Sequence, residues 1–291
     1  MNRVVLAAAF ALLAFAANSI LCRMALRQAS IDPASFTTVR LVAGAFTLWV
    51  LVRLGKARSS AAGNWISACA LLAYAAAFSF AYVAVTAGTG ALLLFGAVQL
   101  IMISVGLVRG ERIDLQLASG WLLAVIGVVI LVFPGVSAAP PIEAALMLGA
   151  GVAWGIYSLR GRRSSDPLRD TAGNFIRAAP GALLVSAAMW RQSSFDGTGV
   201  VLAALSGSLA SGVGYAAWYV ALPRLSAIAA ANLQLSVPLI AALAGVVLFG
   251  EPITVRLAVS SILLLGGIAL ATRRSIELSR PTAGASTTTR A

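Results

Sequence analysis

The chain has 291 residues, of which 60% are hydrophobic and only 10% are charged, and its formal net charge is +12. A soluble domain of this size carries about 25% charged residues, so these charges are too few to cover a surface that faces water. Together with a mean hydropathy of +0.95, this composition predicts an integral membrane protein. The sequence contains no histidine and its two cysteines lack a metal-binding spacing, which excludes histidine-based catalytic triads and zinc sites.

Long apolar runs follow one another along almost the whole chain. A helix of about 20 apolar residues crosses a bilayer, so each such run predicts one membrane span. We find ten of them, at 4–27, 35–54, 65–86, 89–108, 114–133, 142–160, 171–190, 199–220, 226–249 and 253–272. Residues 274–291 are rich in Ser, Thr, Ala and Arg, and we predict that they form a disordered cytoplasmic tail.

The basic residues predict how the spans are oriented. If the N-terminus is cytoplasmic, most of the 21 Lys and Arg residues fall in the cytoplasmic gaps, and four fall on the other side: Arg23, Arg27, Arg191 and Arg256. Lys and Arg accumulate in cytoplasmic loops, so we predict that both termini are cytoplasmic. Since the basic residues occupy short gaps with no room for a nucleic-acid-binding module, we expect no nucleic-acid partner.

The chain also contains traces of an internal repeat. Gly110–Glu111 and Gly250–Glu251 each close the fourth apolar run of one half, 140 positions apart. Three other matches recur at an offset of 137 positions, namely Arg40 with Arg177, Phe78 with Tyr215, and Tyr82 with Tyr219. We therefore predict two five-helix units, 1–135 and 140–273. Because five is odd, the second unit would lie inverted relative to the first, with a central cavity between them.

These features resemble the drug/metabolite transporter superfamily, in its EamA-type branch. The stretch SVPLIAALAGVVLFGEPIT, residues 236–254, is especially similar, whereas the first half departs from the pattern by carrying Val98 where the second half has Pro238. Within the superfamily the chain looks most like YddG-type exporters of amino acids. The resemblance implies a multi-pass protein of the bacterial inner membrane that exports aromatic and other neutral amino acids, and related small metabolites, by alternating access.

Uncharged polar and aromatic side chains in the middle of the spans are the candidates for substrate binding. A buried amide that faces lipid leaves its polar groups unpaired at a cost of several kcal/mol, so such groups should face protein or a water-filled cavity. The candidates are Asn18, Ser19, Phe78, Tyr82, Gln99, Trp154, Tyr157, Ser158, Tyr215, Asn232 and Ser236. The alternative is that they make ordinary interhelical contacts, which is the interpretation we favour for Tyr74.

Two arginines lie near the starts of spans, and each allows two interpretations. Arg40 and Arg177 would either clamp a substrate carboxylate or play a structural role near the interface, and we favour the structural role. Depth in the membrane predicts that Arg40 pairs with Glu251 and that Arg177 pairs with Glu111. We also assign Pro238 a structural role, either as the origin of a kink or as a tolerated residue.

The acidic residues all lie outside the middle of the predicted spans, so none is placed to carry a proton across the membrane. We therefore expect facilitated transport, with no cofactor and no metal. An enzyme is not expected, because a membrane-embedded active site needs a positioned acid, base or metal. The alternatives are a nucleotide-sugar, sugar-phosphate or drug carrier on the same scaffold, or a membrane scaffold without transport. A phosphate cargo would need central Arg or Lys residues, which the sequence does not place there.

Overall fold

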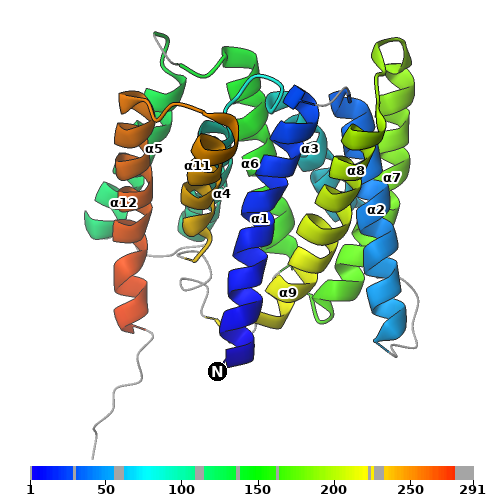
Figure 1. The fold of residues 1–291 in the computed structure, drawn as a ribbon. Coiled ribbons are helices and arrows are strands. Elements are labelled where there is room, and N and C mark those ends of the chain that lie inside the picture. Colours follow the sequence, from blue (N-terminus) through cyan, green and yellow to red (C-terminus); the bar gives the residue numbers. More distant parts are fainter. Residues whose placement is uncertain are drawn as a thin grey trace, which may run out of the picture.

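The computed structural model describes residues 2–28, 31–55, 62–108, 115–135, 138–161, 164–221, 224–225 and 233–278. Every regular element in these ranges is a helix (Figure 1). The helices are α1 (Asn2–Gln28), α2 (Pro33–Leu54), α3 (Trp65–Ala81), α4 (Ala87–Val108), α5 (Leu115–Val132), α6 (Pro141–Gly161), α7 (Pro167–Ala188), η1 (Trp190–Gln192), α8 (Gly197–Leu205), η2 (Ser206–Val213), α9 (Gly214–Ala221), α11 (Ser236–Phe249) and α12 (Val255–Leu278).

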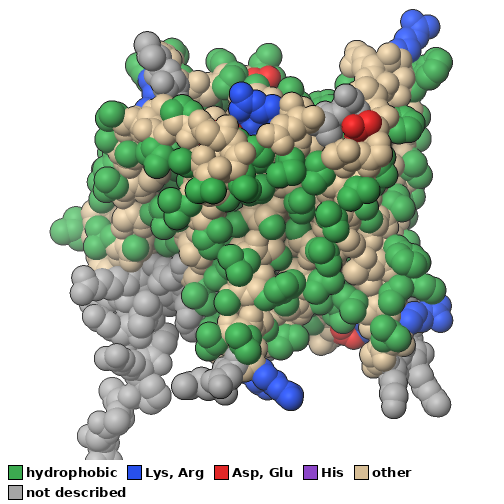
Figure 2. All heavy atoms as spheres, viewed as in Figure 1, with side chains coloured by type: hydrophobic (Ala, Val, Ile, Leu, Met, Phe, Trp, Pro, Cys, Tyr) green, Lys and Arg blue, Asp and Glu red, His purple; other side chains and the backbone are tan. Residues whose placement is uncertain are grey.

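Several of these helices are suited to a bilayer. Within the described ranges, six are long and apolar enough to cross a membrane: Arg3–Gln28, Pro33–Leu54, Ala87–Val105, Leu115–Val132, Pro141–Gly161 and Gly197–Ala221. On the face shown in Figure 2, the charged side chains lie at the upper and lower ends, and hydrophobic side chains cover the band between them. This distribution is the one expected when the middle of the bundle is surrounded by lipid.

Capping residues explain where several helices begin. Asp32 precedes α2 and accepts hydrogen bonds from the backbone N–H groups of Ala34 and Ser35, both at 3.0 Å. Its carboxylate also accepts the N–H of Ser194 at 3.0 Å, which joins the α1–α2 connection to the segment after η1. Partial burial opposes ionisation of this carboxyl, but the hydrogen bonds from Ser35, Ser194 and Ala34 outweigh it and hold the pKa of Asp32 below its ordinary value.

The bounds of three predicted spans differ from the structure. Helix α3 ends at Ala81, and the chain turns at residues 82–85 before α4 begins. In the predicted span 226–249, a turn at Leu235 precedes α11, and residues 226–232 lie outside the described part. Pro238 therefore occupies the first turn of α11, where its missing N–H is not needed for a helical bond and no kink is required. Helix α12 continues through Leu278, and residues 279–291 of the predicted tail are not described.

Helices α4 and α11 run in opposite directions. Glu251, directly after α11, accepts a hydrogen bond from the N–H of Ala87 at the start of α4. The other end of α4, at Val108, is about 30 Å away at 1.5 Å per residue. We call the end of the bundle that holds Glu251 the upper end and the end where α1 begins the lower end, as they appear in Figure 1.

Candidate functional site

A small cavity lies at the centre of the bundle, halfway between the two ends. Its volume of about 20 Å³ has room for roughly one water molecule. Residues from α1, α3, α4, α6, η2 and α9 line it, namely Phe15, Asn18, Ser19, Tyr74, Phe78, Leu94, Phe95, Trp154, Ala210, Ser211 and Tyr215. In this conformation side chains therefore fill most of the space that the sequence analysis assigned to a central cavity.

Aromatic rings make up most of the cavity wall, and Trp154 lies among them. Its ring centroid is 4.9 Å from that of Tyr74, 5.1 Å from that of Tyr215 and 6.4 Å from that of Phe15. It also stacks on Tyr157 at 5.5 Å. Contacts at these distances are favourable for aromatic pairs. The Trp154 ring thus contacts three other aromatic rings of the cavity wall.

A network of polar side chains crosses the same wall. Ser206 donates to Asn18 Oδ1 at 2.6 Å, and Asn18 Nδ2 donates to the Tyr74 hydroxyl at 3.4 Å. Arg40 Nη2 donates to the same hydroxyl at 3.0 Å, and Arg40 Nε donates to Ser211 Oγ at 3.3 Å. The cavity wall therefore combines apolar ring faces with polar groups, and two of these, Tyr74 and Ser211, are bonded to the guanidinium of Arg40.

The position of Arg40 corrects two expectations from the sequence. The predicted pairing of Arg40 with Glu251 is wrong, because Glu251 binds Arg23 instead. Depth alone suggested the pairing, whereas Figure 1 shows that α2 and α11 lie on opposite sides of α1. The expectation that no basic side chain reaches the centre is also wrong, since Arg40 is only 1% exposed and bonds to Tyr74 and Ser211, both of which line the cavity.

The helical segment that contributes Ser211 has an unusual backbone. Residues Ser206–Val213 form a π-helix between α8 and α9, and π-helical turns are often found at functional sites. Gly207 in this segment packs directly on α2, where an added Cβ would overlap the carbonyl oxygen of Arg40. The small residues of the stretch SGSLASGVG therefore let η2 approach α2 closely enough for Ser211 to reach the guanidinium.

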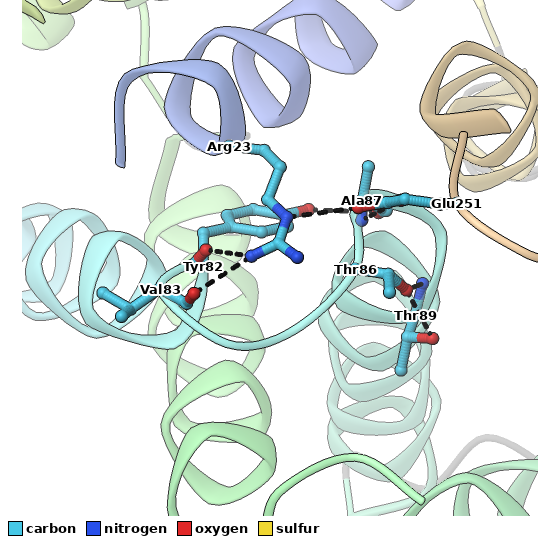
Figure 3. Close-up of polar contacts among 7 residues, drawn as sticks. All are labelled: Arg23, Tyr82, Val83, Thr86, Ala87, Thr89 and Glu251. Atoms are coloured by element: carbon cyan, nitrogen blue, oxygen red, sulfur yellow. Dashed lines mark hydrogen bonds and ion pairs between the residues drawn. The ribbon is translucent and has the colours of Figure 1, made fainter. Parts of the chain in front are cut away.

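At the upper end, Arg23 and Glu251 form a buried ion pair (Figure 3). Arg23 Nε lies 3.1 Å from Glu251 Oε1, and Arg23 Nη1 donates to the carbonyl oxygens of Tyr82 at 2.9 Å and Val83 at 3.1 Å. The other carboxylate oxygen of Glu251 accepts the N–H of Ala87 at 2.8 Å. The pair thus ties α1 to the α3–α4 turn and to the end of α11.

Gly250 explains how Glu251 reaches this position. It adopts φ of 63° at the C-terminus of α11, a left-handed conformation that glycine accepts without a steric penalty. The chain therefore reverses at once, and Glu251 folds back against the start of α4. A hollow of about 230 Å³ lies nearby, lined in part by Thr86, Thr89 and Thr254.

At the lower end, two arginines donate hydrogen bonds to neutral groups. Arg177 Nη1 donates to the carbonyl oxygens of Ala62 at 2.7 Å and Gly173 at 3.0 Å. Arg160 donates to Ser67 Oγ and to Asn64 Oδ1, both at 3.0 Å. The predicted partner of Arg177, Glu111, lies outside the described residues, so that pairing stays a prediction.

The cavity brings together five of the predicted substrate-binding residues: Asn18, Ser19, Phe78, Trp154 and Tyr215. The other candidates lie elsewhere or outside the description. Tyr82 is buried at the upper end, where its hydroxyl donates to the Ala87 carbonyl at 3.3 Å, and Tyr157 is near the lower end, where its hydroxyl donates to Thr171 at 3.4 Å. Gln99 is buried, Ser158 is half-buried, Ser236 donates to the carbonyl of Leu233, and Asn232 is not described.

The sequence analysis assigned Tyr74 to ordinary interhelical contacts, and the structure places it on the cavity wall, on the same helical face as Phe78, four positions on. Phe95 and Ser211 also line the cavity but were not among the candidates, although Phe95 stands four positions before Gln99. Ser211 lies in the small-residue stretch of η2. No group of three His, Cys, Asp or Glu side chains that could hold a metal ion occurs in the part of the chain that is described.

Known proteins resemble this chain in sequence and in fold. The sequence model of the EamA-like transporter family matches residues 141–273. A protein of Pseudomonas aeruginosa described as uncharacterized is 53% identical over 270 residues, which cover 92% of this chain and 94% of that protein. A crystal structure described only as that of a protein has a TM-score of 0.66 and 18% sequence identity, and the match covers 93% of this chain and 97% of the other, so the two share a fold.

Proposed function

Since this chain belongs to the EamA-like transporter family, a family of membrane transporters, we propose that it exports aromatic and other neutral amino acids, and related small metabolites, from the bacterial cytoplasm. The central cavity is the cargo site in this proposal. The observation that carries it is the wall of aromatic rings joined to a polar cluster at Asn18, Arg40 and Tyr74. Apolar rings suit the side chain of such a cargo, and polar groups suit its charged backbone atoms.

We further propose that ten helices cross the inner membrane as two inverted units, 1–135 and 140–273, with both termini cytoplasmic. The opposite directions of α4 and α11 support this arrangement, because these helices occupy equivalent places in the two halves. In this orientation the upper end faces the periplasm. Labelling of single cysteines at Val108 and Gly250 from the two sides of the membrane tests it, and reaction of both from one side would contradict the inversion.

The small volume of the central cavity is consistent with alternating access, in which the protein changes conformation before a cargo enters. The described conformation has room for about one water at the centre, so a cargo enters only when the wall rearranges. No Asp or Glu is among the described residues that line the cavity, which supports facilitated transport without a proton carrier at the site. A sugar phosphate carries two negative charges, which the single guanidinium of Arg40 would not balance, so an amino acid fits the wall better.

Uptake of radiolabelled amino acids into proteoliposomes tests the proposal. We expect the wild-type protein to carry a panel of neutral amino acids with a preference for aromatic ones, and we expect Trp154→Ala to reduce the initial rate at least fivefold. Trp190→Ala is the matched control, because Trp190 is 69% exposed and is not among the residues that line the cavity. An imposed pH gradient should leave the rate within twofold.

Equal rates for empty liposomes and for liposomes that contain the wild-type protein would contradict amino-acid transport. Equal rates for Trp154→Ala and the wild type would remove this side chain from the cargo site. A strong acceleration by the pH gradient would contradict facilitated transport but leave the cargo class intact.

A further inference from the structure

Arg40 is a buried positive charge that has no carboxylate partner among the described residues. The two ion pairs found there join Arg23 to Glu251 and Arg169 to Asp166, and neither includes Arg40. Its side chain is among the largest that are fully buried. A guanidinium stays charged at any physiological pH, and burial of such a charge is unfavourable unless it is paired.

The hydrogen bonds of Arg40 leave one nitrogen open. Nε and Nη2 donate to Ser211 and Tyr74, whereas Nη1 is buried and has no hydrogen-bond partner. The hydroxyl of Tyr215, on the cavity wall, is also buried without a partner. Arg40 does not itself line the cavity, but Ser211 and Tyr74, to which it is bonded, both do. Most buried polar groups in folded proteins are hydrogen-bonded, so an open donor on the wall and another on a residue bonded to the wall call for an explanation.

The rings around Arg40 compensate its charge only in part. The guanidinium carbon lies 5.2 Å from the centroid of Tyr74 and 5.1 Å from that of Phe78. Such contacts attract a cation, but they supply no acceptor for Nη1. A purely structural arginine would be expected to satisfy its donors with carbonyl oxygens, as Arg177 does with those of Ala62 and Gly173.

We propose that the cavity binds the carboxylate of its cargo through Arg40 Nη1 and the hydroxyl of Tyr215, so that a carboxylate group is the feature the site requires. This inference rests on the proposed role of the cavity as the cargo site. Carboxylate oxygens match the donors of a guanidinium, and hydrogen bonds between charged groups are the stronger ones. The surrounding rings then hold an apolar or aromatic body, whether or not the cargo also carries an amine. Compounds without a carboxylate are excluded as good cargo.

Binding of matched ligands to the purified full-length protein in nanodiscs tests this assignment. L-phenylalanine, 3-phenylpropionate, L-phenylalaninamide and phenethylamine share a ring but differ in carboxylate and amine, and quenching of tryptophan fluorescence reports their binding. We expect the two acids to bind at least tenfold more tightly than the amide and the amine. Since the charge of arginine does not titrate, the affinity for 3-phenylpropionate should be constant between pH 6 and 8.

Variants of Arg40 and Tyr215 test whether these two side chains bind the carboxylate. Arg40→Met should abolish the tenfold preference for 3-phenylpropionate over phenethylamine, Arg40→Lys should restore part of it, and Tyr215→Phe should weaken binding of both acids about threefold without changing that of the amine. Arg177→Met is the matched control, since Arg177 is the equivalent arginine of the second half, and it should retain the preference. Tyr215→Phe is a conservative change that keeps the test valid if Arg40→Met does not fold.

The outcomes separate this inference from the proposed function. Equal affinities of the wild type for L-phenylalanine and its amide, or an acid preference that survives Arg40→Met, would overturn the carboxylate site while amino-acid transport could still be measured. Tight, Arg40-dependent binding of 3-phenylpropionate without transport of any amino acid would support the carboxylate site and overturn the proposed function.

Discussion

The ion pair between Arg23 and Glu251 predicts a measurable loss of stability when the carboxylate is neutralised. Both side chains are almost fully buried, and removal of one partner of a buried pair costs about 3–5 kcal/mol. In Glu251→Gln the loss is smaller, because Arg23 keeps the carbonyl oxygens of Tyr82 and Val83 and the new amide oxygen can still accept the N–H of Ala87. What is lost is one charge-assisted bond, worth about 1.5–3 kcal/mol. We expect about 2 kcal/mol.

Thermal unfolding in detergent, followed by tryptophan fluorescence, measures this change. A loss of about 2 kcal/mol corresponds to a decrease of roughly 4–8 °C in Tm for a chain of this size class. Arg23→Met should lower the free energy of unfolding more than Glu251→Gln does, because it leaves Glu251 charged and buried. In the double variant, the loss of free energy should be smaller than the sum of the losses in the two single variants. Arg169→Met is the control, since the pair of Arg169 with Asp166 is partly exposed and should contribute less than about 1 kcal/mol.

An additive double variant, or a Tm for Glu251→Gln within 1 °C of the wild type, would refute this reasoning. The first result would mean that the two side chains do not interact in the folded protein. The second would mean that water or another group replaces the lost bond at the upper end.

Two further substitutions test the packing and the electrostatics of the fold. Gly207→Ala should lower the free energy of unfolding by about 1–3 kcal/mol and reduce transport, because the added Cβ would overlap the carbonyl oxygen of Arg40. Gly149→Ala is the control: no atom lies within 4 Å of its added Cβ, so it should be neutral or stabilising. Asp32→Asn should cost about 0.5–1 kcal/mol at pH 7, because Asn also caps a helix but cannot supply the charge. Since the pKa of Asp32 is lowered in the folded protein, its stabilising effect is present above about pH 4 and disappears as the pH falls through that lowered value, so the melting temperatures of Asp32→Asn and the wild type should converge in acid. Parallel Tm curves from pH 7 to pH 3 would contradict the assignment for Asp32.

Composition and apolar run length were enough to predict an all-helical membrane protein, because both are set by the surrounding lipid. The ends of the helices were harder to predict. The sequence contains no clear stop signal at Ala81, where α3 ends. In the turn that follows, the carbonyl oxygens of Tyr82 and Val83 accept hydrogen bonds from Arg23. These contacts join residues about 60 positions apart, which local patterns do not encode.

The candidate site was predicted in part. Asn18, Phe78 and Trp154 were identified because polar and aromatic residues in the middle of a span are seldom placed toward lipid. The partners of the arginines were not, because helix periodicity gives the depth and the face of a residue but not the neighbouring helix. The pairing of Arg40 with Glu251 was predicted from their depths alone, but α1 lies between their helices, and it is Arg23 of α1 that reaches the carboxylate.

Several residues outside the cavity lie one helical turn from residues that line it, and the candidates Tyr82 and Tyr157 are among them. On α1 and α3, the residues four positions after Ser19 and Phe78 are Arg23 and Tyr82, and both belong to the upper ion-pair cluster. On α6 and α9, the residues three and four positions after Trp154 and Tyr215 are Tyr157 and Tyr219, and both line a second small cavity near Arg160 at the lower end. Four residues of helix advance about 6 Å, so these helices contribute one residue to the cavity and another, about one turn further on, to the contacts at one end of the bundle. In the proposed function, a cargo in the cavity would therefore lie about one helical turn from the contacts at each end, and its binding would bias which end of the bundle opens.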